Sequence, residues 1–194
     1  MHKKYKIYFF LFLLLSGCGL FDLRDPEDPS NTRATFIPPT TPENVTRNLI
    51  SAITEKNVEN YTKCFVDSNY SQRRFSYTPD AVSMSQYPVF ANWSITKEKN
   101  YYNNLAALTN QNATAFLSLP NMNISSATDT AVIDSEYIMI YEHNRATVGK
   151  TMKGKLRFYL STDSRNLWSI HNWIDFKVNE GDTTWSALKA NFSN

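Results

Sequence analysis

Apolar side chains in the first half of the chain recur at helical spacing after a polar, proline-containing stretch. Val45 and Leu49 follow Thr41 and Pro42, a hydroxyl cap and a proline that suit the first turn of a helix. The three-to-four-residue spacing predicts a first helix to about Glu55. The same reasoning predicts a short helix over 58–65, a helix over 94–108 with Ser94 as its cap, and a terminal helix that starts at 183–185.

Beyond Asn110 the apolar positions alternate, as they do in strands. The sequence predicts four successive antiparallel strands over 114–125, 130–143, 150–162 and 167–178, after a short strand over 74–77. Helices followed by long antiparallel strands indicate an α+β layer fold, in which the helices pack on one face of a curved sheet. The terminal helix, with Trp185, Leu188 and Phe192 on its apolar face, is an addition that puts an open pocket in doubt.

Three stretches of the sequence carry a family resemblance. They are the opening Pro42-Glu43-Asn44-Val45, the turn Asn57-Val58-Glu59-Asn60-Tyr61, and the strand Trp168-Ser169-Ile170-His171-Asn172-Trp173-Ile174-Asp175. In this order they resemble the nuclear transport factor 2-like superfamily, also called SnoaL-like or cystatin-like. The resemblance implies a sheet that curls around the helices into a cone. Ketosteroid isomerases, scytalone dehydratases and epoxide hydrolases of that superfamily act with acids, tyrosines or histidines that point into the cone.

The N-terminus has the pattern of a secretory signal. Three lysines precede an apolar run from Ile7 to Leu15, which is too short to span a bilayer. Leu15-Ser16-Gly17-Cys18 resembles the lipobox of bacterial lipoproteins, which implies that 1–17 are removed and that Cys18 is lipidated. In that class an acid after the cysteine favours the inner membrane. Gly19 stands there instead, so the resemblance implies the outer membrane, with the protein facing the periplasm or the exterior.

The composition divides the rest of the chain into a tether and a domain. Residues 18–41 are rich in proline and polar residues and poor in large apolar ones, as is typical of a semi-extended linker. Residues 42–194 are long enough for one domain with its own core. We therefore expect a signal peptide over 1–17, a lipid-anchored tether over 18–41 and a single α+β domain over 42–194.

Charge and cysteine content exclude several classes of function. Loss of 1–17 removes three lysines and no acid, so the formal charge changes from +2 to 2 − 3 = −1. A near-neutral domain argues against nucleic acid as a partner. The basic residues over 150–157 stand at alternate positions, which is typical of the solvent-exposed face of a strand. Cys64 is the only cysteine left beside Cys18, and its helical apolar position favours a buried thiol. The two histidines that remain after loss of 1–17 form no paired motif, so we expect no metal, and no motif indicates a cofactor.

Candidate ligand-binding residues are the aromatic side chains and two polar groups near them. Tyrosine and tryptophan line pockets well because they combine apolar bulk with a polar group. Period-two alternation places His171 and Asp175 on one face of the last strand, about 13 Å apart, which is too far for a catalytic dyad. The candidate set is Trp93, Tyr141, Trp168, His171, Trp173 and Asp175.

The sequence predicts a lipid-anchored protein of the cell envelope whose α+β domain serves as a ligand-binding or protein-interaction module. The expected partners are the membrane, through lipidated Cys18, and a small apolar ligand or another envelope protein. The alternative is an enzyme of the isomerase, dehydratase or hydrolase kind with the same cone-like fold. An enzyme needs at least two polar groups that converge in an open pocket, whereas a binding module needs only an open pocket or patch.

Overall fold

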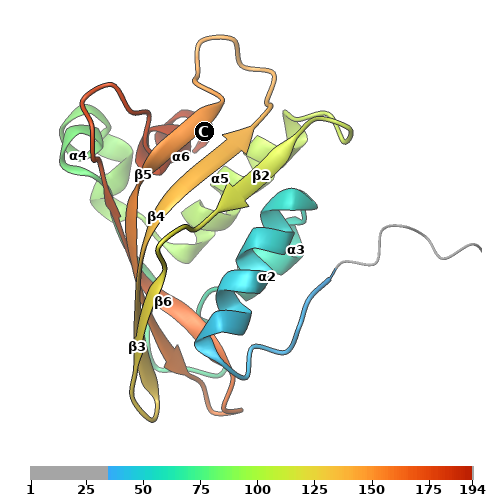
Figure 1. Ribbon diagram of the computed structural model, residues 1–194, viewed down its shortest axis with the longest axis vertical. Helices are drawn as coiled ribbons and strands as arrows, with labels where there is room; N and C mark the ends of the chain where they lie inside the picture. The colour runs from blue at the N-terminus through green and yellow to red at the C-terminus, as the bar shows by residue number, and fades with distance from the viewer. Residues whose placement is uncertain (1–34, 194) are drawn as a thin grey trace, which may run out of the picture. The chain divides into compact units, whose positions relative to one another are not determined.

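A curved, mainly antiparallel sheet wraps around a layer of helices in the computed structural model, which describes residues 35–193 (Figure 1). The signal peptide, Cys18 and most of the predicted tether lie outside the described residues. The helices are α2 (Pro42–Thr54), α3 (Val58–Lys63), α4 (Ala81–Gln86), the 3₁₀ helix η1 (Pro88–Asn92), α5 (Ile95–Ala107) and α6 (Trp185–Phe192). The strands are β1 (Ser76–Thr78), β2 (Ala115–Ser118), β3 (Asn123–Ser126), β4 (Thr130–Tyr141), β5 (Thr151–Thr162) and β6 (Trp168–Phe176). The predicted α+β class is confirmed.

The helices begin where capping side chains supply hydrogen bonds to free backbone N–H groups. Thr41 accepts from the N–H of Asn44 at the start of α2, and Ser94 accepts from the N–H of Lys97 at the start of α5. Thr184 caps α6 in the same way. A cap removes one of the unsatisfied donors that every helix start carries, so these positions fix the three predicted starts.

The strands follow the order β1-β6-β5-β4-β2, and β3 also pairs with β4. β4 and β5 pair antiparallel over eleven residue positions, from Thr130 opposite Ser161 to Ile140 opposite Thr151. β1 is parallel to β6, and the remaining pairs are antiparallel. Figure 1 shows the long strands β4, β5 and β6 curving past α2, α5 and α6, so the helices lie against one face of the sheet. The other face carries the alternating basic residues Lys153 and Lys155, both exposed, as predicted.

The predicted strand over 114–125 is two strands. β2 and β3 are separated by Pro120 and by Asn121, whose φ of 56° lies in the left-handed region. Proline cannot donate to a strand ladder, and left-handed backbone breaks the strand geometry, so the chain turns here and pairs with β4 a second time. The sequence analysis predicts no helix for the stretch that contains α4 and η1. Asp80 caps α4 by accepting from the N–H groups of Val82 and Ser83.

The pairing of β6 with β5 shifts by one residue, so His171 does not lie on the face of the strand that the sequence predicts. Tyr159 pairs with Asn172 but Leu160 pairs with Ile170, which leaves His171 as an extra residue on β6. Ile170 and Trp173 are therefore both fully buried, although they are three residues apart. The prediction that His171 shares a face with Asp175 is wrong, because the extra residue breaks the period-two alternation.

Residues 35–41, which the sequence analysis placed in the tether, contact the folded domain. The side-chain amide of Asn48 on α2 accepts from the N–H of Ile37 at 2.8 Å and donates to its carbonyl at 2.7 Å. The N–H of Trp168 at the start of β6 donates to the carbonyl of Pro39 at 2.7 Å. This segment therefore enters the fold beside α2 and β6. Among residues 35–193, no helix combines the length and the hydropathy that a membrane crossing needs.

Candidate functional site

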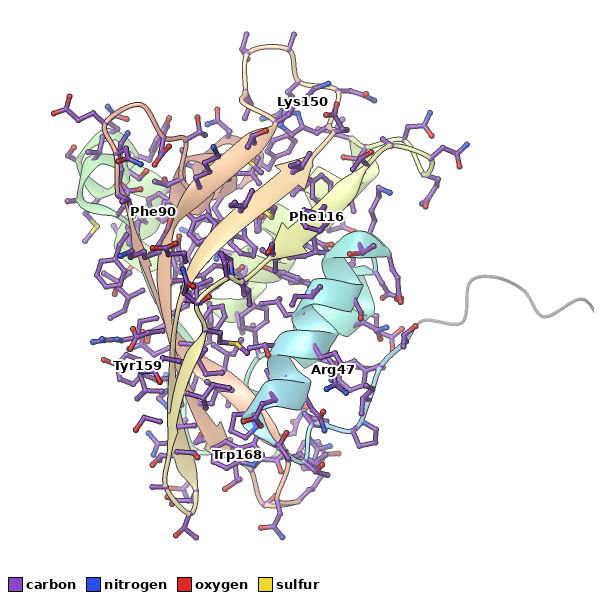
Figure 2. The ribbon with its side chains drawn as sticks, viewed as in Figure 1. Arg47, Phe90, Phe116, Lys150, Tyr159 and Trp168 are labelled. Carbon is purple, nitrogen blue, oxygen red and sulfur yellow. The ribbon has the colours of Figure 1, made fainter. Side chains whose placement is uncertain are left out.

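Helix α6 fills the interior of the cone. Trp185, Leu188 and Phe192 are fully buried. The indole ring of Trp185 packs edge-on against Trp173 with ring centroids 4.6 Å apart, and its Nε1–H donates to the Tyr101 hydroxyl at 2.9 Å. Figure 2 shows side chains filling the space between the helices and the sheet. The apolar face predicted for the terminal helix is confirmed, and it is buried inside the cone.

A buried ion pair joins α6 to α5. The Lys189 ammonium lies 2.7 Å from both carboxylate oxygens of Glu98, and both side chains are essentially inaccessible to water. The Glu98 carboxylate also accepts from the Tyr61 hydroxyl at 2.6 Å and from the Trp93 Nε1–H at 2.7 Å. Burial lowers the pKa of Lys189 to about 8, although the nearby Glu98 carboxylate acts to raise it. The pair is held by four hydrogen bonds inside the core.

A second polar cluster, centred on Asp175, holds the first turn of α6. Its carboxylate accepts from the Tyr137 hydroxyl at 2.9 Å and from the N–H of Ser186 at 2.8 Å. The Ser186 hydroxyl donates to the same carboxylate, and the Tyr77 hydroxyl lies 2.7 Å from the Ser186 hydroxyl. Burial raises the pKa of Asp175, and the hydrogen bonds from Ser186 and Tyr137 oppose that rise. Asp175 therefore serves as the anchor of α6.

Asp80 extends this cluster to α4. Its carboxylate accepts from the Thr184 hydroxyl at 2.6 Å as well as from the two N–H groups at the start of α4. Burial alone would raise the pKa of Asp80, but the hydrogen bonds from Ser83 and Thr184 hold it below its ordinary value. Thus two acids, on β6 and before α4, both bind the start of α6.

Alkaline unfolding is expected from the buried tyrosines. Burial raises the pKa of five tyrosines well above the ordinary value of about 10; they are Tyr61, Tyr77, Tyr101, Tyr102 and Tyr137. Nearby carboxylates add to the rise for each of them except Tyr102. Below pH 10 these tyrosines are protonated in both the folded and the unfolded state, so they do not make the stability depend on pH. Above it only the unfolded chain ionises them, so stability falls as the pH rises. Lys189 has the opposite effect, because stability rises with pH between its lowered folded pKa and its unfolded pKa. It is a single group, and the five tyrosines outweigh it.

The measurement is a pH titration followed by tyrosinate absorbance and near-ultraviolet circular dichroism together. We expect most tyrosinate to appear in one step, together with the loss of tertiary signal. Gradual ionisation of all tyrosines near pH 10 with an intact tertiary signal would show that the interior is open to water.

The structure brings three of the six predicted ligand-binding residues to one region. Trp93 and Trp173 lie around the Lys189 ammonium, and Asp175 lies at the start of α6. Tyr141 is fully buried elsewhere, edge-on to Tyr102. Trp168 lies at the far end of β6 and appears at the lower end of the view in Figure 2. His171 is half-buried, and burial followed by the charge of Arg73 lowers its pKa.

Sequence reasoning missed Glu98 and Lys189, which form the centre of the site. One signal was present: Lys189 follows Trp185 by four residues and precedes Phe192 by three, so it lies on the apolar face of the terminal helix. Its partner Glu98 lies within a polar run, where nothing marks it as buried.

A groove of about 660 Å³ lies on the outside of the domain, where the chain enters the fold. We call it the α3 groove. Arg165 pairs with Asp163 at 2.6 Å and stacks on the Tyr70 ring, with its guanidinium carbon 3.5 Å from the ring centroid. Lys63 pairs with Glu59. The apolar part of the lining consists of Phe36, Pro39, Val58, Phe65, Val66, Ile95, Leu167 and Trp168.

Two further features concern metal and thiol chemistry. Within the described range, 35–193, the acids, histidines and Cys64 form no cluster of three that suits a metal ion. Cys64 is buried, and its thiol donates to the carbonyl of Asn60 at 3.3 Å. Burial raises the pKa of this thiol, so it is held in the protonated, unreactive form.

Comparison with solved structures identifies the fold. A candidate aromatic ring hydroxylase from Novosphingobium aromaticivorans superimposes with a TM-score of 0.53 at 13% identity, covering 75% of this chain and 92% of its own. A nuclear transport factor 2-like superfamily protein from Salmonella enterica serovar Typhimurium gives a TM-score of 0.51 at 12% identity, covering 72% and 92%. A candidate scytalone dehydratase from Novosphingobium aromaticivorans gives 0.53 at 10% identity, covering 69% and 78%.

These likenesses show the cone-like fold predicted from the sequence, and at such low identity they show the fold alone. No protein-family model matches the chain, and no curated protein matches it in sequence.

Proposed function

We propose that this chain is a lipid-anchored protein of the cell envelope whose domain binds a partner on its outer surface. The lipid anchor rests on the lipobox-like Leu15-Ser16-Gly17-Cys18 in the sequence, and the observation that carries surface binding is the filled cone. Trp185, Lys189 and Phe192 occupy the interior, and the hydrogen-bonding oxygens of Glu98 and Asp175 are engaged by groups of the same chain. Catalysis requires convergent polar groups that a substrate can reach. This arrangement therefore favours binding at the surface over chemistry in the cone.

The α3 groove is the proposed contact surface. Its partly exposed apolar lining, including Phe36 and Val58, can accept apolar side chains of a partner, and the ion-paired rim can form hydrogen bonds around them. Two lining residues, Phe36 and Pro39, belong to the segment that leads back towards Cys18. The proposed surface thus lies where the chain continues towards the anchor.

The lipid anchor would limit how far this surface can lie from the membrane. Between Cys18 and Thr35 the chain is 17 residues long, which limits the separation between lipid and domain to roughly 60 Å at full extension. The lipid confines the domain to one surface, so the effective concentration of a partner on the same membrane is raised. Outer-membrane placement, facing the periplasm or the exterior, belongs to this proposal.

Cells that express the chain are expected to incorporate labelled palmitate into it at Cys18. Cys18→Ser should abolish both the label and recovery of the protein in the membrane fraction. The matched control is Cys64→Ser, which removes the other cysteine of the chain and should keep the label. Unlabelled wild-type protein, or label that disappears only with Cys64→Ser, would contradict the anchoring proposal.

A photo-reactive amino acid placed in the α3 groove is expected to cross-link a partner in intact cells. Ser68 is exposed and lines the groove, whereas Lys153 is exposed on the outer face of the sheet and serves as the control position. The groove position should give a discrete adduct by gel electrophoresis and mass spectrometry, and the sheet position should not. Adducts of equal yield from both positions, or from neither, would contradict the groove as the contact surface.

The alternative is an enzyme of the isomerase, dehydratase or hydrolase kind. Two of the structural neighbours are described as a candidate hydroxylase and a candidate dehydratase. Asp175 with Tyr137 is the acid and hydroxyl pair in this chain that most resembles such chemistry, and both side chains are buried against α6. Under our proposal these groups position α6.

A further inference from the structure

The Lys189 ammonium lies in a cage of one carboxylate and several aromatic rings. Both Glu98 oxygens are 2.7 Å from its nitrogen. The ring centroids of Trp173 and Tyr77 are 3.5 and 3.7 Å away, and those of Tyr101 and Trp93 are 5.6 and 5.8 Å away. An ammonium within about 6 Å of aromatic faces is attracted by their quadrupoles, more strongly when it is desolvated. This is the geometry by which proteins recognise ammonium ligands.

No wall of the cage comes from the helix that carries the lysine. Tyr77 is on β1, Trp173 is on β6, and Glu98 and Tyr101 are on α5. The Glu98 carboxylate is also oriented without the lysine, because the Tyr61 hydroxyl and the Trp93 indole each donate to it. The walls of the cage therefore come from other elements of the cone, and α6 supplies only the ammonium group.

We propose that the interior of the cone is a binding site for a primary alkylammonium group and that Lys189 occupies this site as an internal ligand. The inference does not depend on the anchoring or on the α3 groove. The part of the lysine beyond its Cβ atom has the structure of n-propylammonium. Lys189→Ala leaves a space of that size beside the unpaired Glu98 carboxylate. The size of the space and the negative charge together favour binding of n-propylammonium.

The test uses the full chain with Lys189→Ala, purified in detergent and probed with n-propylammonium chloride. We expect a saturable rise in the melting temperature; at ten times its Kd the ligand raises the folding equilibrium constant about elevenfold. Sodium chloride at the same ionic strength and 1-propanol should each give much less. The longer n-hexylammonium should also give less, because its chain exceeds the space that the lysine leaves. Unsubstituted protein should not respond, since its tethered lysine outcompetes a free amine.

The control variant is Lys189→Ala with Glu98→Gln, which keeps the space and removes the charge. It should lose the response to n-propylammonium. If Lys189→Ala responds no more to n-propylammonium than to sodium chloride, or if the double variant responds equally, the proposal is wrong. If Lys189→Ala does not fold without ligand, the yield of refolded protein is measured with n-propylammonium and with sodium chloride. A higher yield with n-propylammonium supports the proposal, and equal yields contradict it.

Discussion

Replacing Glu98 with alanine is expected to lower the free energy of unfolding by about 3–5 kcal/mol, because it leaves a buried ammonium without its counter-charge. Lys189 is completely inaccessible to water, and Glu98 is the carboxylate that forms an ion pair with it, at 2.7 Å. The substitution also removes the acceptor of the Tyr61 hydroxyl and of the Trp93 indole. Urea denaturation followed by tryptophan fluorescence measures the change.

Two controls separate the buried pair from ordinary ion pairs. Glu98→Gln combined with Lys189→Met replaces both charges by neutral groups of similar size, and it should cost far less than Glu98→Ala alone. Glu136→Ala breaks an exposed pair with Lys155 and should change the stability by about 0–1 kcal/mol. A loss below about 1 kcal/mol for Glu98→Ala would mean that the pair is hydrated and that α6 is not packed in the cone.

Truncation of Trp185 to alanine is expected to destabilise the domain by about 3–5 kcal/mol. The side chain is fully buried, packs edge-on against Trp173 and Tyr137, and donates to the Tyr101 hydroxyl. The alanine variant would leave a cavity at the centre of the cone and an unpaired tyrosine hydroxyl. Thermal unfolding by circular dichroism measures the loss.

Trp185→Phe is the matched control for this truncation. It keeps most of the aromatic volume and loses the indole N–H, so it should cost clearly less than Trp185→Ala. Equal and small effects of both substitutions would show that the ring does not fill the interior. A small apolar probe that binds the alanine variant and not the phenylalanine variant would locate the new cavity inside the cone.

The fold was largely predictable because its signals are local. Thr41, Ser94 and Thr184 are capping residues directly before helical spacing, and each caps a helix in the structure. β4 and β5 alternate over most of their length, so their extents are close to the predicted ones. Two errors in the strand predictions come from single residues that interrupt a period. Asn121 breaks a predicted strand into two, and His171 adds one residue to β6.

The candidate site was only partly predictable because its partners are distant in sequence. Periodicity places Lys189 on the inner face of α6, but it cannot indicate that Glu98, 91 residues earlier, lies opposite. Asp175 was selected for its strand face and is buried, whereas its contacts with Ser186 and Tyr137 depend on how α6 docks. Such convergence is a property of the tertiary packing, which a sequence pattern does not encode.

The central claim is that α6 belongs to the core and fills the cone, and native-state hydrogen exchange tests it most directly. The measurement compares the backbone amides of Leu188–Phe192 with those of β4 and β5. We predict opening free energies for α6 that match those of the central strands, since its side chains are buried among theirs. Amides of α6 that exchange readily while β4 and β5 stay protected would contradict the account, because α6 would then be a mobile cover over an open pocket.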